Sequence, residues 1–168
     1  EDQPLAPTSP YAASKAAAEM VCSQYAAGGL AVLRARAFNH LGPGQSERFV
    51  APALAARVLR AAESGARSIT VGRLDTRRDF TDVRDVVKAY RSLVVAGTPG
   101  EAYNVCSGVD VAISQIVDKV MDEVGYRVTL EADPALQRPS DLPVLRGDNT
   151  KLTEATGWQP GISLGTTV

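Results

Sequence analysis

The chain contains few of the residues that build metal centres, disulfide frameworks or hydrolase triads. Among its 168 residues there is one histidine, His40, and there are two cysteines, Cys22 and Cys106, which form no C-x-x-C pair. A zinc site or a disulfide framework is therefore not expected. A single histidine also leaves little for serine-hydrolase chemistry. We predict no metal site in this chain.

Neither the charge nor the hydropathy of the chain points to a nucleic acid or a membrane. The 18 basic residues are balanced by 19 acidic ones, so the net charge is −1. No apolar run approaches the roughly 20 residues that a membrane span needs. Residues 1–4, EDQP, have neither the basic nor the apolar region of a signal peptide. We expect a cytoplasmic protein without a nucleic-acid or membrane partner.

A glycine-rich phosphate-binding turn is also missing. No G-x-G-x-x-G or G-x-x-G-x-x-G stretch lies between a strand-type and a helix-type segment, so the pyrophosphate-binding turn of a Rossmann unit is not seen. The chain does not begin with methionine, and its first ten residues include Pro4, Pro7 and Pro10. We interpret the chain as part of a longer protein.

What is present is a regular alternation of strand-type and helix-type segments. Ser9 and Pro10 predict the start of a helix, and further helices are expected to begin after Asp82, with Asp85 in the first turn, and at Ser114. The predicted helices otherwise cover residues 11–27, 50–64 and 149–155, and the predicted strands cover residues 30–38, 68–71, 78–81, 103–106 and 127–131. Such alternation, with abundant alanine and valine, indicates α/β layers.

The helix after Asp82 has a broad apolar pattern. Its valines, tyrosine and leucine recur at helical spacing and predict one buried stripe. The members of this stripe are Val83, Val86, Val87, Tyr90, Leu93 and Val94.

Tyr11 and Lys15 are the residues with the clearest chemistry. They stand four residues apart at the start of the first predicted helix, so their side chains share one face. A lysine ammonium and the positive end of the helix both stabilise a phenolate. Tyr11 can then act as a proton donor or acceptor at a carbonyl or carbinol oxygen. An ordinary Tyr/Lys surface pair is the alternative reading.

The surrounding residues connect this pair to a family. Residues 9–15, SPYAASK, with Glu19 following, closely resemble the signature of the extended short-chain dehydrogenase/reductases. The resemblance implies that Tyr11 is the catalytic acid/base and that Lys15 assists it. It also implies that both residues contact the nicotinamide end of an NADP or NAD cofactor. The serine or threonine that completes the family's triad falls upstream of this chain.

Later blocks extend the resemblance over essentially the whole chain. Residues 36–45, RAFNHLGPGQ, are similar to a stretch in which the asparagine, here Asn39, contacts the diphosphate of a sugar nucleotide. The residues that follow it, here His40, line the nicotinamide. The alternative is that Asn39 only braces its loop.

Two arginine-containing blocks complete the expected substrate site. Residues 78–85, RDFTDVRD, resemble a family block and make Arg78 the candidate phosphate ligand, with Arg77 as runner-up; a solvated arginine pair is the alternative. Residues 138–141, RPSD, match an element in which Arg138 holds the phosphate and Asp141 the ribose. A polar loop with an Arg–Asp pair explains the same residues.

The blocks look most like those of the GDP-4-keto-6-deoxy-D-mannose reductases. This implies NAD(P)-dependent reduction of the 4-keto group of a GDP-4-keto-6-deoxy-sugar, giving a GDP-rhamnose-type product. Arg73 departs from the pattern, because relatives commonly carry asparagine there, near the nucleotide base. The alternatives are a GDP-mannose 4,6-dehydratase, another nucleotide-sugar epimerase or dehydratase, and a non-catalytic nucleotide-sugar-binding fragment.

The resemblance also implies the architecture. We expect an α/β chain that forms the C-terminal part of a Rossmann-like, doubly wound parallel sheet, together with a small α/β substrate-binding domain. Residues 1–48 would belong to the Rossmann-like part and carry the Tyr/Lys helix. Residues 49–168 would form mainly the substrate-binding domain, with one or more segments returning to the main sheet. The complete enzyme is expected to be a homodimer or homotetramer that binds a GDP-sugar.

Overall fold

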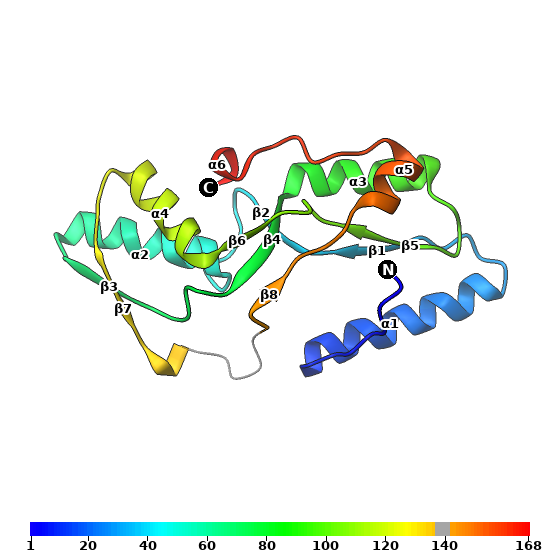
Figure 1. Cartoon of the computed structure of the whole chain (residues 1–168), viewed down its shortest axis with the longest axis horizontal. Coiled ribbons are helices and arrows are strands. Elements are labelled where there is room, and N and C mark those ends of the chain that lie inside the picture. The colour runs from blue at the N-terminus through cyan, green and yellow to red at the C-terminus, as the bar shows by residue number, and fades with distance from the viewer. Residues whose placement is uncertain (137–141) are drawn as a thin grey trace.

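The structure is a computed structural model that describes residues 1–136 and 142–168. The molecule is elongated, with helices and short strands distributed along its long axis (Figure 1). The strands form three sheets. Among the described residues, no helix combines the length and the apolar character needed to cross a membrane.

Two of the sheets are parallel strand pairs at opposite ends of the molecule (Figure 1). At one end, β3 (Ser68–Val71) pairs with β7 (Thr129–Ala132). At the other end, β1 (Arg34–Ala37) pairs with β5 (Ala102–Val105). Both pairs join strands that are far apart in the sequence, as parallel pairing requires.

A mixed sheet occupies the middle of the molecule. Its central strand is β4 (Arg77–Asp82), which pairs in parallel with β2 (Asn39–Leu41) and β8 (Val144–Leu145) and antiparallel with β6 (Asp110–Ala112). Mixed pairing of this kind, with helices around it, makes the fold a mixed α/β fold. The division at residue 48 stays a prediction.

The larger core lies at the β3–β7 end. There α2 (Val50–Ser64) and α4 (Ile113–Val124) bury their apolar faces against each other and the neighbouring strands. Gly65 ends α2 in the left-handed conformation, with φ of 72°, which glycine adopts without a Cβ penalty. The fully buried side chains in this core include those of Val58, Val71, Ile116 and Val117.

A smaller core lies between β1–β5 and the helices α3 (Val83–Ala96) and α5 (Thr150–Thr156). Its buried members are Val86, Ala89, Leu93, Tyr103, Val105, Leu152 and Trp158. Two further elements, η1 (Pro134–Leu136) and α6 (Leu164–Thr167), are single helical turns. The remaining helix, α1 (Pro10–Ala27), has no buried residue.

Several predicted elements are confirmed at their boundaries. Ser9 caps α1 by accepting a hydrogen bond from the Ala12 amide at 3.1 Å, and Pro10 is the first helical residue. Asp82 caps α3 through the Arg84 amide at 2.8 Å. The predictions for residues 50–64 and 68–71 coincide with α2 and β3. These boundaries depend on local capping and spacing signals, which the sequence displays directly.

The strand predicted over residues 30–38 is wrong in extent. Phe38 donates its amide to the Val105 carbonyl at 3.0 Å, and the chain then leaves β5 and pairs with β4 through β2. The ladder with β5 covers only Arg34–Ala37. Asn39, expected in a loop, is therefore the first residue of a strand.

Two predictions about helices are also wrong. Ser114 does not cap α4, because the helix already begins at Ile113 and the amides of both residues donate to carbonyls of the 74–76 segment. In α3, Val87, Tyr90 and Val94 are exposed rather than buried. That side of α3 is open to solvent, whereas Val86, Ala89 and Leu93 pack into the core formed with β5 and α5.

Candidate active site

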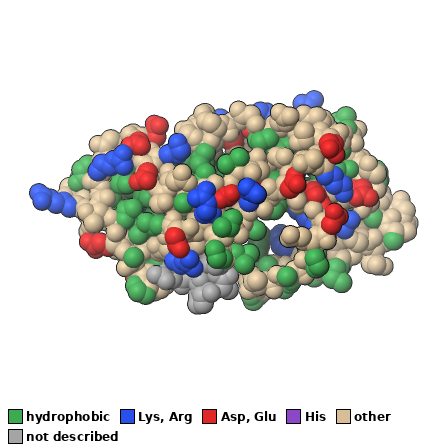
Figure 2. All heavy atoms as spheres, viewed as in Figure 1, with side chains coloured by type: hydrophobic (Ala, Val, Ile, Leu, Met, Phe, Trp, Pro, Cys, Tyr) green, Lys and Arg blue, Asp and Glu red, His purple; other side chains and the backbone are tan. Residues whose placement is uncertain are grey.

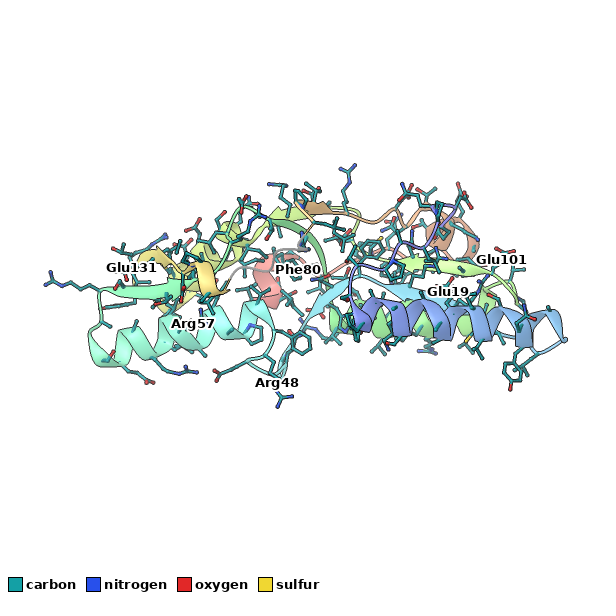
Figure 3. The ribbon with its side chains drawn as sticks, turned by 90° about the horizontal axis from the view of Figure 1, so that it is seen from below. Glu19, Arg48, Arg57, Phe80, Glu101 and Glu131 are labelled. Atoms are coloured by element: carbon teal, nitrogen blue, oxygen red, sulfur yellow. The ribbon has the colours of Figure 1, made fainter. Side chains whose placement is uncertain are left out.

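Tyr11 and Lys15 lie side by side in the first two turns of α1. The Lys15 ammonium lies 5.5 Å from the centroid of the Tyr11 ring, within the range of a cation–π contact. Tyr11 is 73% exposed, so its hydroxyl is open to a reacting molecule. The N-terminal end of α1 points toward the middle of the molecule in both Figure 1 and Figure 3.

A cavity of about 460 Å³ opens beside α2. Its lining combines the loop before α2, the first turns of α2, the segment after β3 and the start of β4. Among residues 1–136 and 142–168, four arginines and one acidic residue line it. The charged lining residues are Arg48, Arg57, Arg73, Arg78 and Glu47.

Two residues expected from sequence, Asn39 and Arg78, both line this cavity. The parallel pairing of β2 with β4 brings them together, because Asn39 is in register with Phe80, two residues after Arg78. Arg78 is only 9% exposed and donates from Nη1 to the Arg77 carbonyl at 2.7 Å. The sheet thus holds an amide and a guanidinium, residues that are far apart in sequence, at one wall.

Arg77, the runner-up phosphate ligand, is engaged elsewhere. Its Nε donates to the Asp110 carboxylate and its Nη2 donates to the Asp110 carbonyl at 2.9 Å. The hydrogen bond from Arg77 lowers the pKa of the Asp110 carboxyl. Arg77 therefore ties β4 to β6 and is not among the described residues that line the cavity.

The sequence did not identify Arg48 and Arg57 as site residues. Arg73 stood out only because relatives commonly carry asparagine at its position. Arg57 projects from α2 and donates to the Thr70 carbonyl of β3 at 2.6 Å. Arg73 forms two hydrogen bonds with the Asp75 carboxylate, at 3.1 and 2.7 Å. No spacing rule signals these arginines, because the segments that carry them border one cavity only when α2 packs beside β3. In Figure 3 the Arg48 side chain points outward from the molecule.

His40 does not line the cavity in the described part of the chain, and neither do Tyr11 and Lys15. The His40 ring nitrogen Nδ1 lies 3.1 Å from the Phe38 carbonyl, and Gln45 donates to the His40 carbonyl at 3.1 Å. These contacts brace the turn after β2. Arg138 and Asp141 lie outside the described residues, so their predicted roles stay predictions.

Asp79 is a buried residue that sequence reasoning did not single out. Its carboxylate is 1% exposed and accepts hydrogen bonds from the amides of Ser107, Gly108 and Gly147 and from the Ser107 hydroxyl. The distances range from 2.6 to 3.3 Å. Asp79 thereby joins β4 to the loops after β5 and β8, next to Arg78.

Asp82 and Asp85, predicted as capping residues, do more than cap α3. Asp82 also accepts from the Thr167 hydroxyl at 2.8 Å. The Asp85 carboxylate accepts from the amides of Gly161 and Ile162, at 2.8 and 2.7 Å. Together the two carboxylates attach the C-terminal segment to the start of α3.

On the face drawn in Figure 2 the two signs of charge are mixed. Figure 2 shows basic and acidic side chains interspersed with hydrophobic ones, without a continuous patch of one sign on that face. In the described segments, no group of three or more His, Cys, Asp or Glu side chains is arranged to hold a metal ion. The excess of arginine at the cavity is therefore a local feature of this protein.

Comparison with known proteins gives consistent matches. The family profile described as "GDP-mannose 4,6 dehydratase" matches residues 1–168. The GDP-6-deoxy-D-mannose reductase of Pseudomonas aeruginosa is 39% identical over 160 residues, which cover 94% of this chain and 53% of that protein. The GDP-mannose 4,6-dehydratase of Sinorhizobium fredii is 27% identical, over 95% of this chain and 51% of its own length.

Solved structures agree. The structure of RMD from Pseudomonas aeruginosa complexed with NADPH has a TM-score of 0.91 at 38% identity and covers 99% of this chain and 56% of that one. UDP-glucose 4-epimerase from Thermotoga maritima with UDP-glucose has a TM-score of 0.87 at 27% identity, over 96% of this chain and 52% of that one.

The chain spans about half the length of the relatives it matches. Over that half, the sequence profile, the sequence identities and the superposed structures agree. This chain belongs to the GDP-mannose 4,6 dehydratase family, within the extended short-chain dehydrogenase/reductases.

Proposed function

We propose that the protein containing this chain reduces the 4-keto group of a GDP-4-keto-6-deoxy-sugar with NADPH or NADH, giving a GDP-rhamnose-type product. The observation that carries the proposal is the cavity lined by four arginines in a chain with a net charge of −1. A nucleoside diphosphate sugar is a ligand that needs such a concentration of guanidinium groups. The 39% identity to a GDP-6-deoxy-D-mannose reductase supports the choice of substrate.

The substrate's diphosphate would bind at the cavity wall formed by Asn39 and Arg78. A guanidinium presents a rigid fork of N–H donors that matches phosphate oxygens, and an amide adds a further donor. Arg48 and Arg57 line the same cavity and add positive charge. Arg138 and Asp141 are proposed to contribute a phosphate contact and a ribose contact.

Tyr11 would supply the proton of the reaction. When a hydride adds to the C4 carbonyl carbon, the carbonyl oxygen becomes an alkoxide and needs a proton. The Tyr11 hydroxyl donates it and leaves a phenolate, which the Lys15 ammonium, 5.5 Å from the ring centroid, stabilises. The N-terminal end of α1, where both residues lie, favours the same negative charge.

The residues present suit the nicotinamide end of a dinucleotide. Lys15 is exposed and offers three N–H donors, and Tyr11 offers a hydroxyl in the adjacent turn. These are the groups that can hold ribose hydroxyls. His40, an exposed residue of β2, is proposed to lie along the same cofactor. When bound, NADPH or NADH supplies the hydride.

Two alternatives would use all or some of the same residues. A GDP-mannose 4,6-dehydratase also fits the family profile and would regenerate its cofactor in each cycle. A non-catalytic nucleotide-sugar-binding protein would use the cavity without the Tyr11/Lys15 pair. The two differ from the proposal in whether reduced cofactor is consumed.

The test is a turnover assay on the full-length protein. With GDP-4-keto-6-deoxymannose and NADPH or NADH, we expect loss of the reduced cofactor's absorbance matched by formation of a GDP-6-deoxyhexose. Conversion of GDP-mannose to the 4-keto sugar without net cofactor consumption would support the dehydratase instead. Tight GDP-sugar binding with no turnover of any of these sugars would leave the binding protein.

A further inference from the structure

The helix that carries Tyr11 and Lys15 is held to the rest of this chain mainly by charged side chains. None of the residues of α1 is buried, and its larger apolar side chains Met20, Val21 and Tyr25 are 55–67% exposed. Apolar packing within the chain therefore does little to set the rotation of α1 about its axis. In this chain, which spans about half the length of the relatives it matches, the polar contacts of Glu19 and its neighbours set this rotation instead.

Glu19 extends the face on which the proposed catalytic pair lies. It follows Lys15 by four residues and Tyr11 by eight, which is close to one and two turns of a helix with about 3.6 residues per turn. Figure 3 shows Glu19 at the side of α1 that meets the strands behind it. Holding Glu19 against the strands therefore fixes the rotation of the helix from which Tyr11 and Lys15 project.

Arg36 forms a bidentate ion pair with Glu19 through two of its nitrogens. Its Nε lies 3.1 and 3.0 Å from the two carboxylate oxygens, and its Nη2 lies 2.6 Å from Oε1. Arg34 adds a longer hydrogen bond to Glu19 at 3.4 Å and a second contact with α1 through the Ser23 hydroxyl at 2.7 Å. Glu19 is only 15% exposed, so solvent screens this pair less than a surface pair.

Arg34 and Arg36 belong to β1 and make further hydrogen bonds with residues beside β5. Arg34 donates to the Gly100 carbonyl at 2.7 Å, just before β5, and Arg36 donates to the Glu1 carbonyl at 2.8 Å. Glu1 in turn accepts from the Asn104 amide of β5 at 2.7 Å. Because β1 continues through Phe38 into β2, these contacts connect α1 to the strand that begins with Asn39.

We infer that Glu19 is a positioning residue, whose hydrogen bonds with Arg36 and Arg34 set the rotation of the helix that bears Tyr11 and Lys15 relative to β1. The inference rests on the proposed catalytic role of Tyr11. The bidentate geometry matters because a single contact would leave the helix free to turn about it, whereas two parallel contacts restrict that rotation. A small error in the direction of the phenol affects proton transfer without changing the cavity.

The experiment compares Glu19→Ala, Glu19→Gln and Tyr11→Phe in the full-length protein. Glu19→Ala should lower kcat by about tenfold and leave KM for the GDP-sugar unchanged, because the cavity residues are intact. In a Tyr11→Phe background the same substitution should cause almost no further loss of kcat. Glu101→Gln, which removes an exposed ion pair with Lys151, is the matched control and should leave kcat unchanged.

The outcomes separate this inference from the proposed function. A Glu19→Ala enzyme with normal kcat, beside a strongly impaired Tyr11→Phe enzyme, overturns the positioning role alone. Equal losses of kcat in both backgrounds, or a rise in KM with the fall in kcat, also overturn it. A fully active Tyr11→Phe enzyme overturns the proposed function. If Glu19→Ala does not fold, Glu19→Gln, which keeps the side-chain volume but loses the charge, decides the same question.

Discussion

The two ends of the molecule bury their helices to different degrees. At the β3–β7 end, α4 buries Ile113, Ile116, Val117, Val120 and Met121, and α2 buries a matching stripe. At the β1–β5 end, α1 buries none of its residues and α3 leaves one whole side exposed. The difference shows that an apolar pattern marks a face able to pack, and that burial requires an element of the chain lying against it.

The same contrast separates the two parts of the candidate site. The arginine cavity is lined by elements whose packing is extensive, whereas Tyr11 and Lys15 stand on the exposed helix. Ligand binding at the cavity and chemistry at Tyr11 should therefore respond to different substitutions. The following predictions test that separation.

The largest effect should come from Tyr11→Phe. We expect kcat of the full-length enzyme to fall by about a thousandfold, because the proton donor is lost while the ring remains. KM should stay within about twofold, since Tyr11 does not line the cavity. Steady-state kinetics measure both constants. Tyr25→Phe, on the same helix and 62% exposed, is the control, and a Tyr11→Phe enzyme of normal kcat would contradict the assignment.

Asp79→Ala tests how much the hydrogen bonds between β4 and the loops after β5 and β8 contribute to the stability of the chain. The substitution leaves three amides and a hydroxyl without their buried acceptor. The free energy of unfolding of this chain should fall by about 4 kcal/mol. Urea denaturation monitored by circular dichroism gives the value. Asp118→Ala, with a side chain 57% exposed, should change it by less than about 0.5 kcal/mol.

Leu54→Ala compares the packing of the two ends directly. Leu54 on α2 is 4% exposed, so its truncation should cost about 3 kcal/mol in the free energy of unfolding. Val94 on α3 is 79% exposed, and Val94→Ala should cost less than about 0.5 kcal/mol. The same denaturation experiment measures both. Equal losses would mean that the outer side of α3 is packed in solution.

The smallest effect concerns acid stability at the start of α3. A hydrogen bond from Arg84 holds the pKa of the Asp82 carboxyl well below its usual range, against the opposing effect of burial. A lowered folded-state pKa contributes stability above the unfolded pKa of about 4, and this stability is lost as the pH falls toward the folded value. Asp82→Asn should cost about 1 kcal/mol at pH 7, and this difference should shrink steadily as the pH falls below about 4. Thermal melts across this range test it, and a constant difference would contradict the linkage.

Local signals predicted much of the fold. Ser9 with Pro10 marks the start of α1, and Gly65 marks the end of α2, because caps depend on residues within one turn. The extent of the strand after residue 30 was not predictable in the same way. Whether a residue there pairs with β5 or β4 is decided by the position of strands more than 40 residues away in the chain.

The residues of the candidate site also differ in whether the sequence could identify them. Tyr11 and Lys15 were recognised from their own spacing and motif, and Asn39 and Arg78 from two further motifs. Arg48 and Arg57 belong to no motif and enter the site only through the packing of α2 beside β3. The position of His40 near a cofactor, implied by the resemblance, stays a prediction; its ring nitrogen Nδ1 lies 3.1 Å from the Phe38 carbonyl.

The amino-acid sequence by itself determined the start of α1, the bounds of α2, the Tyr11/Lys15 pair and the family motifs, since each depends on residues near one another in the chain. The tertiary structure decided which apolar faces are buried and which arginines share a cavity. It also decided that Glu19 meets Arg36. Those outcomes depend on contacts between distant segments, and only the packing of the whole chain brings such segments within hydrogen-bonding or van der Waals distance.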